Sequence, residues 1–155
     1  MAQAPTVHAS AVLVGTRALL IRGPAGSGKS RLAFKLIEAG QAGMLPFARL
    51  VADDRVRLEP CHGRLIARAP QELAGLIEVR GLGIRRMAYE PIAVVGRVVD
   101  LAAADAERLP NRRTQIEVEG VPLPRLPVAV NQDPCPAVLA WLMTAAADEV
   151  LVAEK

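Results

Sequence analysis

Aromatic side chains are scarce in this chain of 155 residues, since phenylalanine, tryptophan and tyrosine together make up only 3% of it. Proteins that bind single-stranded nucleic acid stack the bases on aromatic rings, so this mode of binding is not expected. The core must rest on leucine, valine, isoleucine and alanine instead. Hydrophobic residues make up 52% of the sequence, which is enough for one compact core, and we expect residues 1–155 to form a single domain.

Long runs of one charge are missing as well. The formal net charge is +3, and the arginines, which far outnumber the lysines, alternate with acidic residues along the chain. Duplex nucleic acid is bound by clustered basic residues that neutralise its phosphates. The charge pattern therefore predicts no nucleic-acid partner.

Cysteines are few and long apolar runs are absent. The two cysteines, Cys61 and Cys135, have neither C-x-x-C spacing nor metal-ligand spacing. Their number permits a disulfide without implying one, and two reduced, partly buried thiols in a cytoplasmic protein is the simpler interpretation. No stretch approaches the ~18 apolar residues of a membrane helix, and the first ten residues lack the basic segment of a secretory signal. We expect a cytoplasmic protein without a membrane partner.

A complete phosphate-binding pattern, G-x-x-x-x-G-K-S, stands at residues 23–30. Its residues are Gly23, Pro24, Ala25, Gly26, Ser27, Gly28, Lys29 and Ser30. An apolar strand pattern precedes it, and a helical stripe of apolar residues follows it. In this setting the glycines turn backbone N–H groups toward a phosphate, and the helix N-terminus adds partial positive charge. The pattern predicts ATP binding, with Lys29 on the outer phosphates and the Ser30 hydroxyl on Mg²⁺.

Short strand patterns dominate the rest of the chain. They lie over 11–14, 18–21, 49–52, 56–58, 64–67, 76–80, 92–101, 115–119 and 128–130, with 56–58 and 64–67 as a hairpin and a bend at Gly96. Helices are predicted from Lys29 to a C-terminal cap at Gly40, in one or two turns of 70–76, and from 134 to about 147 with Asp133 as N-cap. The pattern indicates an α/β fold with a phosphate-loop core, a strand-rich middle and a C-terminal helix.

Asp53 and Asp54 directly follow the apolar strand pattern over 49–52. Carboxylates at the carboxyl end of such a strand often lie beside the phosphate loop. One of them is suited to hold Mg²⁺ and the other to accept a proton from an attacking hydroxyl. A plain role as turn or cap residues remains open from the residues alone. The segment 77–84, Ile-Glu-Val-Arg-Gly-Leu-Gly-Ile, is also compatible with no more than a surface ion pair and a glycine turn.

Taken in their order along the chain, these sequence motifs resemble the catalytic domain of HPr kinase/phosphorylase, a bacterial family. The matching blocks are Val7-His8-Ala9-Ser10, the phosphate loop with residues 50–56, and residues 77–86, which resemble the signature I/L-E-x-R-G-L-G-I. A weaker match runs from 107 through 114–116 to 126–128. The family phosphorylates a serine of the phosphocarrier protein HPr and often reverses the reaction by phosphorolysis. The resemblance implies a phosphate-loop α/β core akin to that of phosphoenolpyruvate carboxykinase.

The resemblance also implies roles for single residues. Glu78 joins Ser30 as a Mg²⁺ ligand. Asp54 acts as general base toward the substrate serine and as general acid in the reverse direction, and we then assign Asp53 to Mg²⁺. His8 and Arg108 assist around the transferring phosphoryl group. An HPr-like phosphocarrier is the implied partner, and homohexamers are the implied assembly.

The chain departs from the family at three places. It starts almost at the catalytic core, so it is expected to be a short form without the N-terminal domain. Arg31 stands where the family usually has glutamate, and residues 127–133 replace P-V-R-P-G-R-N without its two arginines. That segment is linked in the family to dephosphorylation. Two alternatives stay open, a phosphate-loop kinase of a small metabolite and a non-catalytic nucleotide-sensing module.

Overall fold

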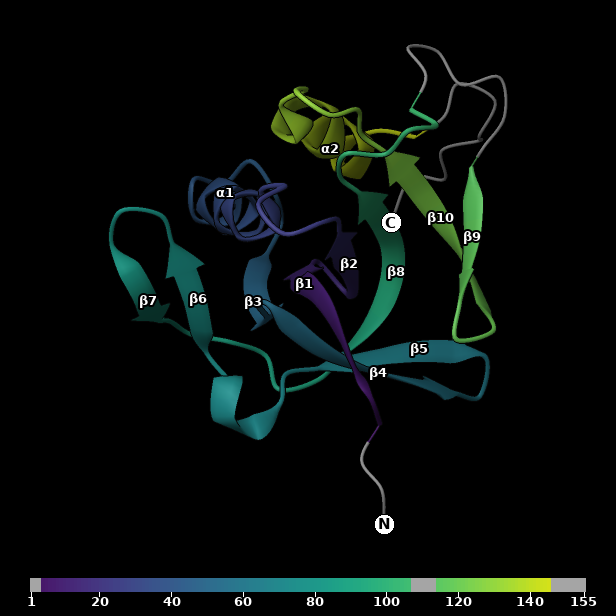
Figure 1. The fold of residues 1–155 in the computed structure, drawn as a ribbon, viewed down its shortest axis with the longest axis horizontal. Coiled ribbons are helices and arrows are strands. Elements are labelled where there is room, and N and C mark those ends of the chain that lie inside the picture. Colours follow the sequence, from purple (N-terminus) through teal and green to yellow (C-terminus); the bar gives the residue numbers. More distant parts are fainter. Residues whose placement is uncertain (1–3, 107–113, 146–155) are drawn as a thin grey trace, which may run out of the picture.

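A computed structural model describes residues 4–106 and 114–145 (Figure 1). The strands in this part of the chain are β1 (Thr6–Val14), β2 (Arg17–Arg22), β3 (Ala48–Ala52), β4 (Arg55–Cys61), β5 (Arg64–Arg68), β6 (Leu76–Val79), β7 (Gly83–Arg86), β8 (Ala93–Asp100), β9 (Gln115–Val118) and β10 (Val121–Pro127). The helices are α1 (Lys29–Gln41), α2 (Pro134–Met143) and a short 3₁₀ helix (Gln71–Leu73). None of the helices in these ranges has the length and apolar character needed to cross a membrane.

Five strands of the main sheet close into a ring. β1 pairs antiparallel with β2 and β4, β4 with β5, and β5 with β8, while β8 returns to β2 in a parallel pairing. The expected irregularity lies at Gly96, because the register between β2 and β8 skips a residue there. A Cβ on Gly96 would lie 2.7 Å from the Cβ of Arg17, so only glycine fits at this point of the curve.

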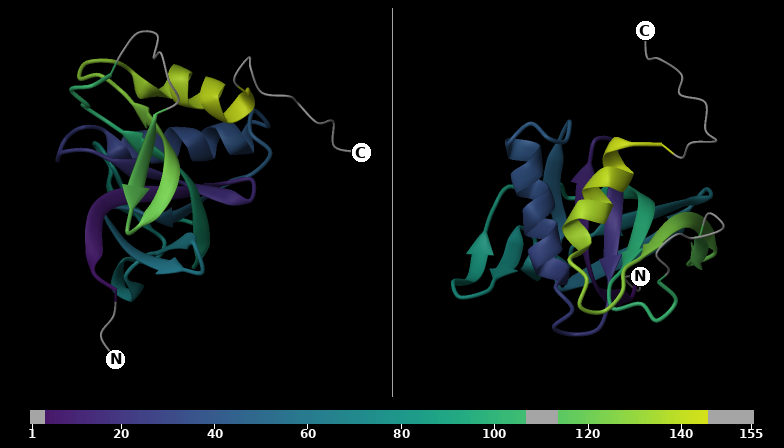
Figure 2. Two further views of the ribbon diagram at one scale, coloured as in Figure 1. Left: turned by 90° about the vertical axis from the view of Figure 1, so that its right-hand side faces the viewer. Right: turned by 90° about the horizontal axis from the view of Figure 1, so that it is seen from above.

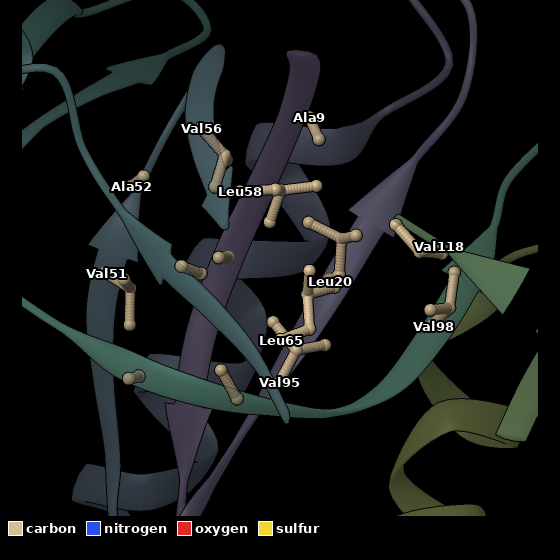
Figure 3. Close-up of a cluster of buried hydrophobic side chains, with 14 of the residues drawn as sticks. Ala9, Leu20, Val51, Ala52, Val56, Leu58, Leu65, Val95, Val98 and Val118 are labelled. Atoms are coloured by element: carbon tan, nitrogen blue, oxygen red, sulfur yellow. The ribbon is translucent and has the colours of Figure 1, made fainter. Parts of the chain in front are cut away.

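The inside of the ring is packed with small and branched apolar side chains. Ala9, Leu20, Val56, Leu65 and Val98 are fully buried there, and Figure 3 shows the side chains of this cluster gathered between the strands. Alternate residues of each strand point to the same face, so the apolar residues at every second position of these strands fill this core.

A second core lies between the sheet and the two helices. Leu32, Leu36 and Ile37 of α1 are buried against Leu19 and Leu50 of the sheet. The spacing of the α1 residues places them on one face of the helix. Both views in Figure 2 show α1 and α2 side by side over the same side of the sheet. The helices therefore hold the segment that precedes α1 against the ends of β2 and β3.

Most of the predicted elements are confirmed, with longer strands than the patterns indicated. The hairpin of 56–58 with 64–67 is confirmed as β4 and β5. The predicted strand over 128–130 is wrong, because the strand is β10 and ends at Pro127. Pro122 and Pro124 fall where β10 has β9 as its paired neighbour, and β8 joins only from Arg125 onward. The edge of β10 that faces away from β9 has no paired strand at these two positions and needs no N–H donor there, so prolines are tolerated within the strand.

Two helix ends also differ from the prediction. Gly40 is not the cap of α1, because the helix continues through it to Gln41. α2 ends at Met143 rather than near 147, and the hydroxyl of Thr144 donates to the carbonyl of Ala140 at 2.6 Å. The start of α2 is as predicted, since the Asp133 side chain accepts the backbone N–H of Cys135 at 3.0 Å.

Candidate functional site

Residues 23–28 form a loop between the end of β2 and the start of α1, and Lys29 and Ser30 are the first two residues of that helix. Gly26 and Gly28 have φ values of 79° and 98°, which favour glycine over every other residue. The first turn of α1 closes on this loop, because the N–H of Leu32 donates to the carbonyl of Gly28 at 3.0 Å. The N-terminus of α1, with its partial positive charge, therefore opens directly onto the loop.

The loop contains a polar atom that lacks a partner. The Ser27 Oγ atom is buried and makes no hydrogen bond within the described residues. It lies against Gly23, where a Cβ would come within 2.5 Å of it. A buried hydroxyl without a partner costs about 1–3 kcal/mol. The loop is thus built to receive a hydrogen-bonding group from outside the chain, and an anionic phosphate fits.

Lys29 is buried in the loop, with 6% of the residue exposed. Its ammonium donates to the carbonyls of Gly23 at 2.8 Å and of Pro24 at 3.0 Å. Burial lowers the pKa of Lys29, and the nearby carboxylates of Asp54 and Asp53 offset part of this effect. The ammonium is therefore held mainly by neutral carbonyl groups, and a triphosphate would offer it a stronger partner.

Asp53 directly follows the last residue of β3 and accepts hydrogen bonds from residues of three other elements. The Ser10 hydroxyl of β1 donates to Oδ1 at 2.6 Å, and the Ser30 hydroxyl of α1 lies 2.8 Å from both carboxylate oxygens. The backbone N–H of Glu78 in β6 donates to Oδ2 at 3.1 Å. Asp53 is only 4% exposed, so these donors replace water around its charge.

Asp54 turns away from this cluster. Its φ of 66° is left-handed, and its side chain is 65% exposed. Its Oδ1 lies 3.0 Å from Nε2 of His8. The exposed carboxylate next to a buried one gives the site a proton acceptor that an incoming hydroxyl can reach.

The structure brings together most of the residues that the sequence analysis singled out. His8, Lys29, Ser30, Asp53 and Asp54 are linked by the contacts above or lie within electrostatic reach of one another. Glu78 joins through its backbone, and its side chain is exposed on β6. Arg108 lies outside the described residues. No three histidine, cysteine, aspartate or glutamate side chains in residues 4–106 and 114–145 are grouped to hold a metal by themselves.

Ser10 is the residue of the site that the sequence analysis gave no role. It is completely buried in β1 between Ala9 and Ala11, which are also fully buried. A hydroxyl inside an otherwise apolar strand needs a hydrogen-bond partner, so the sequence did contain a sign that Ser10 is bonded to another polar group. The sequence could not identify that partner, which lies 43 residues further along the chain.

Comparison with known proteins gives a family model and relatives that agree with one another in their descriptions. A family model described as HPr Serine kinase C-terminal domain matches residues 1–153. The HPr kinase/phosphorylase of Clostridium beijerinckii is 42% identical over 78 residues, which cover 50% of this chain and 24% of that protein. The HPr kinase/phosphorylase of Geobacillus thermodenitrificans is 35% identical over 142 residues, covering 83% of this chain and 44% of that protein. This chain therefore spans less than half the length of both relatives.

A solved structure shares the fold. The Hpr(Ser) kinase/phosphatase from Coxiella burnetii superposes with a TM-score of 0.71 at 24% identity. The match covers 90% of this chain and 93% of the other one. The strand-rich α/β architecture with its C-terminal helix is thus that of an HPr kinase structure.

Proposed function

The chain belongs to the HPr serine kinase C-terminal domain family, and on that premise we propose that it transfers the γ-phosphoryl group of ATP to a serine of an HPr-like phosphocarrier protein. One observation carries the proposal. A buried lysine in a glycine loop, a buried aspartate and an exposed aspartate converge at the ends of β2 and β3. Phosphoryl transfer needs these three parts, which grip phosphates, neutralise charge and accept a proton.

Asp54 is the proposed general base. The substrate serine gives its proton to the Asp54 carboxylate while its oxygen forms a bond to the γ-phosphorus. The bond from that phosphorus to the bridging oxygen breaks, and ADP leaves. Lys29 stays on the phosphates, and His8 holds the Asp54 carboxylate at 3.0 Å. In phosphorolysis, inorganic phosphate attacks the phosphoserine, pyrophosphate leaves, and Asp54 returns the proton.

The donor set fits a magnesium ion that is shared with ATP. Ser30 and Asp53 supply a hydroxyl and a carboxylate in contact with each other, and the exposed carboxylate of Glu78, whose backbone N–H donates to Asp53, would supply a second one. Mg²⁺ usually takes one or two protein carboxylates together with phosphate oxygens and water. When bound there, Mg²⁺ would neutralise charge on the β- and γ-phosphates. By family resemblance, we assign Arg108 a supporting role in the transfer of the phosphoryl group. A Glu78→Gln variant is expected to need more Mg²⁺ for half-maximal activity, and an unchanged metal titration would remove Glu78 from this set.

A protein substrate is favoured over a small metabolite by the β6–β7 hairpin. The hairpin stands apart from the main sheet (Figure 1) and begins beside Asp53. Leu82 and Ile84 are 62% and 64% exposed on it, with exposed Arg85 and Arg86 beside them. Apolar side chains rimmed by charges suit a protein surface. We therefore propose that the phosphocarrier docks on this hairpin, in the cytoplasm where ATP is available, and that the active form is a homo-oligomer, a hexamer by family resemblance.

The test is incubation with γ-labelled ATP and Mg²⁺, with and without a purified HPr-like protein. Label on a serine of that protein is the expected result, and Lys29→Ala is expected to abolish it. Label on a metabolite from a cell extract would favour the small-metabolite kinase instead. ATP binding without any turnover would favour a nucleotide-sensing module. Adding inorganic phosphate to the phosphorylated product tests phosphorolysis, which the missing arginines in 127–133 predict to be weak.

A further inference from the structure

Strand β3 contains one extra residue opposite β1. Leu50 of β3 pairs with Val12 of β1. Ala52, two positions later, pairs with the immediate neighbour of Val12, so Val51 is left over between the two pairs. An extra residue of this kind is a β-bulge, and bulges are frequent next to active sites, where they redirect a side chain. The bulge in β3 lies just before Asp53.

The bulge changes the face to which the end of β3 points. Leu50 lies in the core beneath the helices, whereas Val51 and Ala52 both lie in the core inside the ring (Figure 3). In a regular strand Ala52 would return to the helix side, and Asp53 would point into the apolar ring. Because the bulge adds a residue, the Asp53 carboxylate points toward the helices instead and meets Ser30 of α1.

The same shift in register brings Ser10 opposite Asp53. Ser10 is the residue of β1 next to Ala11, which pairs with Ala52 across the ladder. Its hydroxyl donates to Oδ1 of Asp53 at 2.6 Å, and the residue is completely buried. Without the shift, Ala9 would stand opposite Asp53, and its side chain has no hydrogen-bond donor. The bulge and the Ser10 hydroxyl therefore act together on the direction of one carboxylate.

Ser10 differs from the other two donors to Asp53. The Ser30 hydroxyl is the group that we assign to Mg²⁺, so its bond to Asp53 has to adjust when the metal binds. The backbone N–H of Glu78 belongs to the β6–β7 hairpin, which stands apart from the main sheet (Figure 1). Ser10 lies in β1, which has β2 paired along one edge and β3 along the other. Its hydroxyl is therefore the donor whose position depends least on what the site binds.

We propose that Ser10 is a positioning residue, which holds the Asp53 carboxylate in the orientation needed for a Mg²⁺ ion shared with ATP. The inference rests on the proposed function, because it needs ATP and Mg²⁺ to bind at the phosphate loop. Ser10 is fully buried and acts through Asp53. Loss of a hydrogen-bond partner from a metal-binding side chain typically lowers metal affinity about 10- to 100-fold.

The test compares ATP binding to the unaltered chain and to Ser10→Ala, with and without the metal. Calorimetry gives the Kd of ATP in excess Mg²⁺ and again in EDTA. Ser10→Ala is expected to weaken ATP binding about tenfold in Mg²⁺ and to leave the Kd in EDTA unchanged. A residue with a merely structural role would not change the effect of the metal in this selective way.

Val12→Ala is the matched control. Val12 is fully buried on the same strand and the same face as Ser10, and it has no polar group in its side chain. Its truncation lowers the free energy of unfolding through lost packing and removes no donor. Both Kd values of Val12→Ala are expected to equal those of the unaltered chain. If Ser10→Ala does not fold, Ser10→Cys repeats the comparison, because a thiol of similar size is only a weak donor.

Three outcomes would overturn the inference while the proposed kinase function stands. The first is an unchanged effect of Mg²⁺ in the variants of Ser10. The second is equal weakening in Val12→Ala, because lost packing alone would then account for it. The third is equal weakening with and without Mg²⁺, which would mean that Ser10 supports the loop rather than the metal-binding carboxylate. Absence of ATP binding to the unaltered chain would refute the proposed function, and this inference with it.

Discussion

Asp53 and Asp54 are neighbours in the sequence, but their carboxylates lie in opposite environments. Asp53 is enclosed by the hydroxyls of Ser10 and Ser30, whereas Asp54 is largely exposed beside His8. The left-handed backbone at Asp54 produces the difference, because it turns the second side chain outward. At the residue scale, one carboxylate is therefore enclosed by donors, and the other is accessible for the proton transfer that we propose.

Asp54→Asn is expected to separate binding from chemistry. Asparagine tolerates left-handed backbone as well as aspartate does, so the fold should be unaffected. The amide cannot accept the serine proton, and phosphoryl transfer should fall at least ~10²-fold. Calorimetry should show ATP binding close to that of the unaltered chain. Activity equal to the unaltered chain would exclude Asp54 as the base.

Ser10→Ala is expected to destabilise the chain through Asp53. The change removes one of three donors from a buried carboxylate, and such a loss costs about 1–3 kcal/mol of the free energy of unfolding. Urea denaturation of the ligand-free protein measures it. Ser27→Ala is the matched control, because it removes a buried hydroxyl that has no partner among the described residues and should be neutral or stabilising. Equal losses in the two variants would mean that the bond from Ser10 to Asp53 contributes nothing.

At the element scale, close contact between α1 and β3 supports the loop. Gly40 of α1 faces Ala48 of β3, and a Cβ on Gly40 would lie 2.6 Å from the Ala48 Cβ and 2.9 Å from its backbone nitrogen. The helix rests on the strand that carries Asp53. The separation between these two elements therefore influences how Ser30, at the start of α1, meets Asp53.

Gly40→Ala is expected to lower stability although alanine is the better helix former. In an unhindered helix the change would stabilise by about 1 kcal/mol. Here the new methyl group meets backbone that cannot rotate away, and overpacking of this kind costs about 1–3 kcal/mol. Urea denaturation is again the measurement. Gln41→Ala, at an exposed position of the same helix, is the control that should be neutral or stabilising, and a stabilised Gly40→Ala variant would contradict the packing argument.

At the scale of the whole molecule, Asp100 links three strands. Arg22 at the end of β2 donates to both of its oxygens at 2.8 Å, and Arg125 of β10 donates to Oδ2. Arg125 also pairs with Asp105. Gly23, which follows Arg22, begins the loop of residues 23–28, so this network connects the loop to β8 and β10.

Asp100→Asn is expected to cost stability at neutral pH and little in acid. Burial alone would raise the pKa of Asp100, but the hydrogen bonds from Arg22 and Arg125 outweigh it and the pKa lies below its usual value. The carboxylate therefore stabilises the fold above about pH 4, and this contribution is lost as the pH falls through its lowered pKa. Breaking this pairing leaves Arg22 without a charged partner among the described residues and leaves Arg125 with Asp105 alone, and we expect a loss of about 2 kcal/mol or more at pH 7.

Denaturation at pH 7 and in acid measures this difference. Asp105→Asn is the control, because its side chain is 62% exposed and solvent screens its pairing with Arg125. A loss for Asp100→Asn that stays the same at both pH values would show that its charge is not the source of the effect.

The sequence by itself determined the local features of this protein. The glycine loop, the face of α1, the hairpin of β4 with β5, and the cap of α2 at Asp133 each depend on residues a few positions apart. Such features follow from backbone preferences and side-chain periodicity. The positions of Lys29, Ser30, Asp53 and Asp54 near one another were likewise predictable, because carboxylates that follow the carboxyl end of a strand often lie beside a phosphate-binding loop.

Only the tertiary structure decided the rest. The ring closed by β2 and β8, the strand that contains Pro122 and Pro124, and the bond from Ser10 to Asp53 join segments that are far apart in the sequence. A cavity of about 430 Å³ beside the loop is likewise lined by residues from 26–32 on one wall and from 128–135 on another. These contacts depend on strand register and on how the two layers pack, and a single shift in register would turn Ser10 to the opposite face of its strand.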